Sequence, residues 1–380
     1  MKVSRRQFLT SAATLTVAGA IMPYAEIAKM MRSHSGELDL IRAGQVVFQP
    51  GLNAFDYLSA DDVHQKSVFE WNIKNGNIRA FDTSTVVHVV ETHPIDANLA
   101  VLGTKRTDQI SMIDWNLKKE IFRNRLPLGQ HFYGHAVFSD DGKYIVTSVH
   151  NRVGRSQICI LEVPSLKIVD SIMVPHGTAH EMVNVGKNQF LFGVGNDQKH
   201  SVAFGMFDLA TKQIIFYETE FGPSNNVLSI THLKDCGDRY IANVNLWNDL
   251  EATRGALVSI DLKTKTVKTE IPLGDADLLS EMLSFEFEPF RDHAWITLPR
   301  QNQIKVWNLK TDSLVKTIGL GRSESPTAVT YLSQLDLSIV TTQSQFFAFD
   351  AKTFQRREAF EKTVPNSLLC GGVTAHTRLV

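Results

Sequence analysis

Short runs of β-branched and aromatic residues alternate with polar turns along most of the chain. In seven places a run ends in an acidic or amide residue, continues through a polar turn and enters a second run, as in MIDWNLKKEI and VWNLKTDSLV. Asp and Asn favour such turns because their side chains accept hydrogen bonds from nearby backbone N–H groups. The pattern predicts short antiparallel strands joined by tight turns. The seven turns are centred on Asn72, Asp114, Glu162, Asp208, Asp261, Asn308 and Asp350.

The turns recur at intervals of 42 to 53 residues. A repeat of this length built from short strands is typical of a β-propeller, because one four-stranded blade cannot bury its own faces and must stack on its neighbours. We therefore predict an all-β fold, a seven-bladed β-propeller of the YVTN/WD40-like kind. Two stacked β-sandwiches also produce frequent turns, but sandwiches do not repeat one pattern seven times.

Composition narrows the classes of partner. The chain has 380 residues, 43% of them hydrophobic, and a formal net charge of −1. A charge so close to zero makes nucleic acid and anionic membrane surfaces unexpected partners. Beyond the N-terminal segment, no stretch reaches the roughly 18 apolar residues of a membrane span. The three cysteines have no metal-ligand spacing and are too few for a disulfide framework.

The first residues have the pattern of a targeting segment. Ser4-Arg5-Arg6-Gln7-Phe8-Leu9 precedes an uncharged, mildly apolar run from Thr10 to Met22. This pattern resembles a twin-arginine export signal; an ordinary Sec signal or a chance arginine pair is the alternative. We expect a signal peptide over 1–25, a linker over 26–45 and the propeller over 46–380. The twin-arginine export machinery is then a partner, and the periplasm is the expected location.

Two features of the chain concern the ring itself. Closing a propeller requires strands from both chain ends in one blade, because an open sheet edge invites aggregation. Either the first strand, near Leu38 to Phe48, or the C-terminal stretch 367–380 supplies the closing strand. The longest insertion, residues 245–255, is expected to be a long loop, and it reads equally well as a lid or contact surface and as a neutral insertion.

Histidines recur between the turns. Aligning the intervals on the stretch that begins at Gly134 places a histidine at the same point of four successive repeats, and Ser284 and Thr327 at that point in the next two. Equivalent positions of a propeller form a ring about its axis, so we expect the four imidazoles to converge near the central channel. Taken singly, each histidine reads more simply as a hydrogen-bonding partner of a neighbouring backbone. The four histidines are His88, His135, His180 and His232.

Histidine is the usual protein ligand of zinc, copper and iron, and it also transfers protons near neutral pH. We therefore expect a site for a transition metal (iron, copper or zinc) formed by His135, His180 and His232. Glu181 directly follows His180 and offers a carboxylate to the same ring. Arginines are candidates for binding a carboxylate or phosphate ligand beside it. The candidate ligand-binding residues are His135, His180, Glu181, His232, His88 and Arg254, with Arg152, Arg155 and Arg300 expected on the same face.

Three stretches around these histidines carry a family resemblance. The stretches 129–139 (GQHFYGHAVFS), 177–181 (GTAHE) and 228–233 (LSITHL) resemble the FYGHGVFS, GPHE and SIRHL motifs of the DUF1513 family. The resemblance implies an exported, twin-arginine-signalled propeller of undefined biochemistry, associated with periplasmic iron-uptake components. The chain departs from those motifs at Ala136, Ala179 and Thr231, where the family tends to have Gly, Pro and Arg, and the loss of that arginine removes an anion contact it would make.

The sequence thus favours a periplasmic propeller that binds a metal or small ligand through its histidines and serves iron or metal handling, together with a periplasmic protein partner. Two other functions fit the same residues. One is an interaction scaffold whose contact surface is the 245–255 insertion, with no small-molecule site. The other is a propeller enzyme, either lactonase-like or a metal-dependent oxidoreductase, which needs Glu181 and the histidines within reach of a substrate carbonyl.

Overall fold

The computed structural model describes the chain in segments that all lie in one compact unit, Asp39–Val380. The predicted signal peptide lies outside these segments. The described residues are 40–46, 66–72, 78–85, 87–151, 155–175, 177–197, 202–218, 227–248, 251–271, 282–321, 324–333, 335–342, 345–363 and 378–379.

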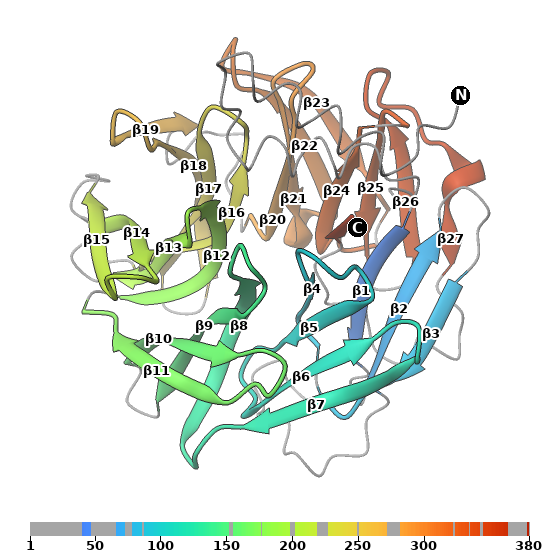
Figure 1. Ribbon diagram of the computed structural model, residues 1–380. Coiled ribbons are helices and arrows are strands. Elements are labelled where there is room, and N and C mark those ends of the chain that lie inside the picture. The colour runs from blue at the N-terminus through green and yellow to red at the C-terminus, as the bar shows by residue number, and fades with distance from the viewer. Residues whose placement is uncertain are drawn as a thin grey trace, which may run out of the picture. The chain divides into compact units, whose positions relative to one another are not determined.

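Within this part of the chain the strands form six antiparallel sheets, five of four strands and one of eight (Figure 1). The first three sheets contain β28 (Arg378–Leu379), β1 (Leu40–Val46), β2 (Lys66–Asn72) and β3 (Ile78–Asp82); β4 (Val89–Thr92), β5 (Leu99–Gly103), β6 (Gln109–Asp114) and β7 (Lys119–Arg125); and β8 (Gln130–Phe138), β9 (Tyr144–Asn151), β10 (Ser156–Glu162) and β11 (Ile168–Met173).

The eight-stranded sheet contains β12 (Thr178–Gly186), β13 (Gln189–Asp197), β14 (Val202–Asp208), β15 (Gln213–Glu218), β16 (Val227–Asp235), β17 (Tyr240–Asn248), β18 (Glu251–Asp261) and β19 (Thr266–Ile271). The last two sheets contain β20 (Ser284–Glu288), β21 (His293–Leu298), β22 (Gln303–Asn308) and β23 (Ser313–Gly319), and β24 (Ala328–Leu332), β25 (Leu337–Thr341), β26 (Gln345–Asp350) and β27 (Lys362–Thr363). Two 3-10 turns, η3 (Pro299–Gln301) and η4 (Glu358–Phe360), lie among them.

The middle of this unit is lined by β4, β8, β12, β16, β20, β24 and β28. Contacts run from β4 to β8, β12, β16, β20, β24 and β28 in turn, so the sheets follow one another around a common centre (Figure 1). The two chain ends meet in one sheet, where Ile41 pairs with Leu379 and Arg42 with Arg378. The C-terminal strand β28 therefore closes the ring beside β1, which answers the question that the sequence left open.

The predicted turn chemistry is confirmed at five of the seven turns, and the turn that follows Asn72 lies outside the described residues. The Oδ1 of Asp114 accepts hydrogen bonds from the N–H groups of Asn116 and Leu117 at 2.8 and 2.9 Å. Asp208, Asp261, Asn308 and Asp350 each accept the same pair of bonds. At Glu162 the backbone carbonyl instead accepts from Leu166, at 2.7 Å. These short turns hold consecutive strands in register.

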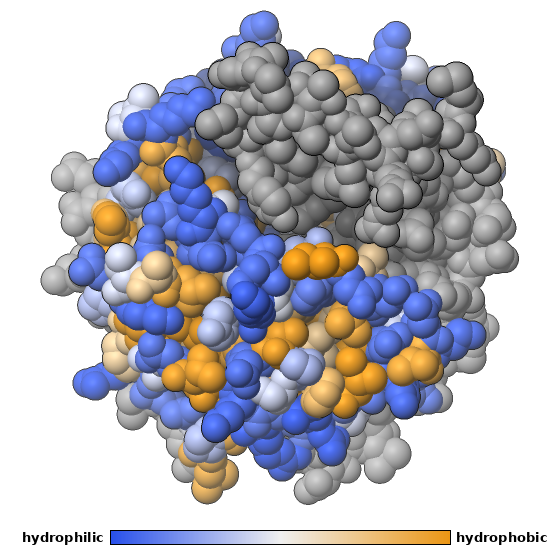
Figure 2. Space-filling view, viewed as in Figure 1, coloured by the Kyte–Doolittle hydropathy of each residue, from blue (hydrophilic) through white to orange (hydrophobic). Residues whose placement is uncertain are grey.

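The core lies between neighbouring sheets. Phe190, Phe192 and Phe207 of the eight-stranded sheet are fully buried in one cluster with Ile158 and Ile160 of β10. Such clusters recur around the ring, which is the face-to-face stacking that the repeat length predicted. On the outside, apolar side chains of the described residues are interspersed with hydrophilic ones on the face that Figure 2 shows.

The structure corrects the interpretation of residues 245–255. We expected a long loop, but β17 and β18 run through this stretch as one extended hairpin, with Asn245 paired to Gly255 and Leu246 to Arg254. Continued backbone pairing satisfies the N–H and C=O groups that a loop would leave to water.

Among the described residues, Cys159 and Cys236 are free thiols, and no helix combines the length and apolar character needed to cross a membrane.

Candidate metal site

The predicted ring of equivalent positions exists. His135 lies in β8, His180 in β12, His232 in β16 and Ser284 in β20, while His88 and Thr327 directly precede β4 and β24. All six thus belong to the strands that line the middle of the unit or directly precede one of them. The alignment of the repeats, which required small gaps at His88 and Ser284, is confirmed at both positions.

Three of these strands carry an irregularity that the sequence did not reveal. The pairing of β8 with β9 shifts register between Phe132 and Ala136, so that His135 lies inside the shift. The register of β12 shifts between Ala179 and Met182, around His180 and Glu181. The register of β16 shifts between Ile230 and Leu233, around His232. A β-bulge bends its strand and re-aims the side chains at that point, so three successive inner strands are bent where they present their polar residues.

Side chains replace the ladder bonds that the bulges remove. In β8 the carbonyl of His135 accepts a hydrogen bond from Thr147 Oγ1 at 2.8 Å, and that of Tyr133 accepts one from Ser148 Oγ at 3.0 Å. In β16 the N–H of His232 donates to Asn243 Oδ1 at 2.6 Å. Buried backbone groups are costly to leave unpaired, so these polar residues on β9 and β17 stabilise the bent strands.

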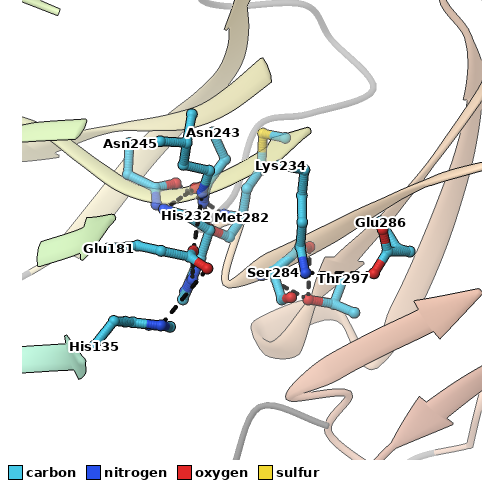
Figure 3. A network of polar contacts seen from close by, with 11 residues as sticks. His135, Glu181, His232, Lys234, Asn243, Asn245, Met282, Ser284, Glu286 and Thr297 are labelled. Atoms are coloured by element: carbon cyan, nitrogen blue, oxygen red, sulfur yellow. Dashed lines mark hydrogen bonds and ion pairs between the residues drawn. The ribbon is translucent and has the colours of Figure 1, made fainter. Parts of the chain in front are cut away.

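Glu181 joins the strands at the centre of the site (Figure 3). Its Oε2 lies 2.9 Å from His232 Nδ1 and also accepts the N–H of Leu233 at 2.9 Å. Its Oε1 lies 3.6 Å from His135 Nδ1. The three side chains are no more than 5% exposed, and one ligand atom from each lies within 4.8 Å of the others.

These separations suit a metal ion. Zinc binds His nitrogen and carboxylate oxygen at about 2.0 to 2.2 Å, so two such ligand atoms in a tetrahedral site lie roughly 3.4 Å apart. The distance from Glu181 Oε2 to His232 Nδ1, 2.9 Å, and that from Glu181 Oε1 to His135 Nδ1, 3.6 Å, lie on either side of that value. Two histidines with one carboxylate is a ligand set found for zinc and for non-haem iron. The donor set therefore fits a divalent transition metal.

His180 and His88 extend the cluster. The ring centre of His180 lies 5.4 Å from that of His135 and 5.7 Å from that of His232. His88 lies 5.3 Å from His135 and 5.7 Å from His180. The rings meet edge to face, so four imidazoles and one carboxylate fill the centre together. The group of converging ligand atoms nevertheless contains Glu181 rather than His180.

The surroundings favour neutral imidazoles. Burial lowers the pKa of His180 and of His232 well below the usual range, and the positive charge of Lys105 lowers both further. The neutral form is the one that binds a metal. Beside His232, Lys234 forms an ion pair with Glu286 at 3.3 Å (Figure 3). Burial lowers the pKa of Lys234, but the carboxylates of Glu286 and Glu181 outweigh it and raise that pKa above its usual value.

Buried amides fix the β16 side of the site (Figure 3). Asn243 Nδ2 and Asn245 Nδ2 both donate to the carbonyl of Met282, at 2.7 and 2.9 Å, and Met282 N–H donates to Asn245 Oδ1 at 2.9 Å. Asn243 therefore links the backbone of His232 to the segment before β20. Asn245, which we had assigned to a surface loop, is a buried supporting residue.

The other candidates fall in different places. The backbone of Arg254 lies in β18, and its side chain is outside the described part, as is Arg152. Arg155 and Arg300 are exposed in turns. Sequence reasoning missed Lys105, Asn243 and His150, because no pattern in the sequence marks a turn lysine or a second-strand amide as a neighbour of an inner-strand histidine.

Comparisons with known proteins support the fold. No family model and no curated protein matches the sequence. Among solved structures, the chain is similar to dihydro-heme d1 dehydrogenase NirN in complex with DHE, with 12% identity over 91% of this chain and 76% of that one and a TM-score of 0.55. It is also similar to apo AztD from Citrobacter koseri, with 10% identity over 89% and 98% of the two chains and a TM-score of 0.52.

A chain of the mitotic checkpoint complex is similar as well, with 11% identity over 76% of this chain and 79% of that one and a TM-score of 0.52. Identities this low carry information on fold and none on activity. Together with the ring of antiparallel sheets, they identify the fold as a β-propeller. The resemblance to the DUF1513 family stays a prediction from the motifs.

Proposed function

We propose that this protein is an exported, periplasmic β-propeller that binds a divalent transition metal, zinc or iron, through His135, Glu181 and His232, with His180 as the next nearest imidazole. One observation carries the proposal: two imidazoles and a carboxylate, each on or beside a bulge of an inner strand, converge in a buried centre. A buried carboxylate among neutral imidazoles is costly without a directly bound counter-charge, and the nearby ammonium of Lys234 forms its ion pair with Glu286. A bound cation supplies that counter-charge.

The fold proposed for this function has seven blades. The eight-stranded sheet holds its strands in the order of two repeats, β12–β15 and β16–β19, joined where Gly195 pairs with Ser229. Counting these as two blades gives one blade for each of the seven turns. The join lies next to His180 and His232, so it also fixes the spacing of two inner strands of the site.

The cellular setting is part of the proposal. The twin-arginine pattern at residues 4–9 supports export by the machinery that carries folded proteins, into the periplasm. A metal that must be loaded or protected during folding is one reason to use that route. Handling of iron or another metal, with a periplasmic protein partner, is the role that we propose.

Metal content decides the proposal. We would purify the protein after export through its own signal and measure metals by elemental mass spectrometry, beside Glu181→Gln and a His135→Gln/His232→Gln variant. We expect one zinc or iron per chain, lost in both variants. The matched control is His93→Gln, because His93 lies in the β4–β5 turn, where it contacts the carbonyl of Gly142. Folded protein without metal, or a metal kept in both variants, would refute the site.

A further inference from the structure

The turn between β5 and β6 brings a positive charge to the edge of the metal site. Lys105 pairs with Tyr133 of β8 in an isolated bridge, and its Nζ lies 5.6 Å from the centre of the Tyr133 ring. The N–H of Gly134 donates to the carbonyl of Thr104 at 2.9 Å. This turn is thus attached to the bulge that presents His135.

Tyr133 connects that turn with the histidines. Its ring meets His180 edge to face at 5.4 Å and stacks on His150 at 3.7 Å. Lys105 and Tyr133 are partly exposed, whereas His180 is buried. They therefore lie between solvent and the imidazoles.

Basic residues recur in the equivalent turns. Arg106 follows Lys105, Arg155 lies between β9 and β10, and Arg300 lies between β21 and β22. Two acidic residues near these turns already have partners. Asp108 pairs with Arg125 at 3.5 Å, and Glu324 accepts hydrogen bonds from Thr342 and Gln345. The partners of Glu324 are uncharged, so its negative charge remains, but the four basic residues of these turns outnumber it.

Resting on the proposed function, we propose that the metal takes a small oxyanion, a carboxylate or a phosphate, as its exogenous ligand, and that Lys105 recruits it past Tyr133. Two imidazoles and one carboxylate leave at least one position of a four-coordinate ion open. The Lys105 ammonium lies over the Tyr133 ring, whose edge meets His180, and an ammonium on this approach favours an anionic ligand over a neutral one, because the charge-assisted bond is the stronger.

Cobalt(II) is a suitable probe, since its visible absorption bands report its coordination. We would load the exported chain with Co²⁺ and titrate it separately with acetate, citrate and inorganic phosphate. The variants are Lys105→Met, Lys105→Arg and the control Lys310→Met, an exposed lysine after β22. A charge-assisted bond contributes about 1.5 to 3 kcal/mol, so Lys105→Met should weaken anion binding about tenfold or more. Lys105→Arg should restore most of it, and Lys310→Met should leave it unchanged.

The outcomes are separable. If the cobalt spectrum shifts with citrate or acetate but not with phosphate, the exogenous ligand is a carboxylate. If it shifts with phosphate but not with citrate or acetate, the ligand is a phosphate. Cobalt that binds at one per chain with a spectrum indifferent to every anion overturns this inference and leaves the metal site standing. Anion binding equal in wild type and Lys105→Met also overturns it. Absence of cobalt binding in the folded wild-type chain overturns both proposals.

Discussion

The two halves of the inner ring use equivalent positions in different ways. On one half, β8, β12 and β16 are bulged and present His135, His180 with Glu181, and His232. On the other half, β20 and β24 pair with their neighbours in unbroken register. Ser284 there is held by Thr297, whose Oγ1 accepts its N–H at 2.9 Å and donates to its carbonyl at 3.0 Å. We call these the histidine half and the serine half.

The contrast between bulged and unbroken inner strands distinguishes the features that the propeller fold requires from those that form the candidate metal site. The serine half shows that the fold needs no histidine at the inner position, because the small residue Ser284 pairs in regular register and its backbone N–H and carbonyl both have partners. The bulges and their supporting side chains therefore belong to the site and not to the propeller. Each prediction below compares the two halves.

Acid should destabilise the histidine half most. Burial, with the charges of His131 and Lys105, lowers the pKa of His150 to about 3, whereas an unfolded histidine titrates near 6.5. Between these pH values only the unfolded chain binds the proton. The contribution of His150 to the free energy of unfolding is therefore constant above pH 6.5 and falls as the pH drops toward 3. The shift corresponds to a loss of up to about 5 kcal/mol at pH 3.

Urea unfolding of the metal-free chain from pH 7 to 4 measures this loss. His150→Phe keeps the stack on Tyr133 and should reduce the slope by about one proton in this range. Ser284→Ala, on the serine half, should leave the slope as in wild type. An unchanged slope in His150→Phe would show that other groups carry the acid sensitivity.

Removing one imidazole from Glu181 should have the next largest effect. In His232→Phe the carboxylate keeps the N–H of Leu233 but loses the hydrogen bond of its closest imidazole, and a buried hydrogen bond to a charged group contributes about 1.5 to 3 kcal/mol. His232→Phe combined with Glu181→Leu should recover most of that loss, because no buried charge remains.

The counterpart on the serine half is Thr297→Val, which removes two hydrogen bonds between uncharged groups and should cost about 1 to 3 kcal/mol by leaving Ser284 N–H unpaired. Denaturant unfolding of the metal-free variants measures all three. If the double variant is no more stable than His232→Phe alone, the cost is one of packing and not of charge.

The sequence predicted the scaffold far better than the site. Residues such as Asp114 and Asn308 mark turns by local chemistry, which tertiary packing does not override, so the repeat and the inner-strand position of His135, His180 and His232 followed from it. The bulges did not, because a register shift depends on what the partner strand offers. Asn243 and Thr147 satisfy the bent backbone from β17 and β9, and nothing in their local sequence marks that role. The sequence offered Glu181 as a candidate for the ring, but not that Glu181, at the bulge of β12, would join the converging ligand atoms in place of His180.

The smallest expected effect concerns the glycine at the β8 bulge. Gly134 has φ +118°, and a Cβ there lies 3.1 Å from the carbonyl oxygen of His180 and 3.2 Å from its Nε2. A backbone conformation of this kind costs a residue with a side chain about 1 to 3 kcal/mol. Gly134→Ala should therefore lower stability by about 2 kcal/mol and also weaken metal binding, since β8 and β12 must separate slightly.

Gly319 provides the control in β23, the outer strand of the sheet that contains Ser284. A Cβ at Gly319 meets no other described atom within 4 Å, and its φ is not in the left-handed region. Gly319→Ala should be neutral or slightly stabilising, because alanine reduces the freedom of the unfolded chain. Calorimetric melting and cobalt titration of the two variants measure both effects. Equal stability losses would mean that the bulge at Gly134 relaxes freely, and then its geometry is not what sets the spacing of His135 and His180.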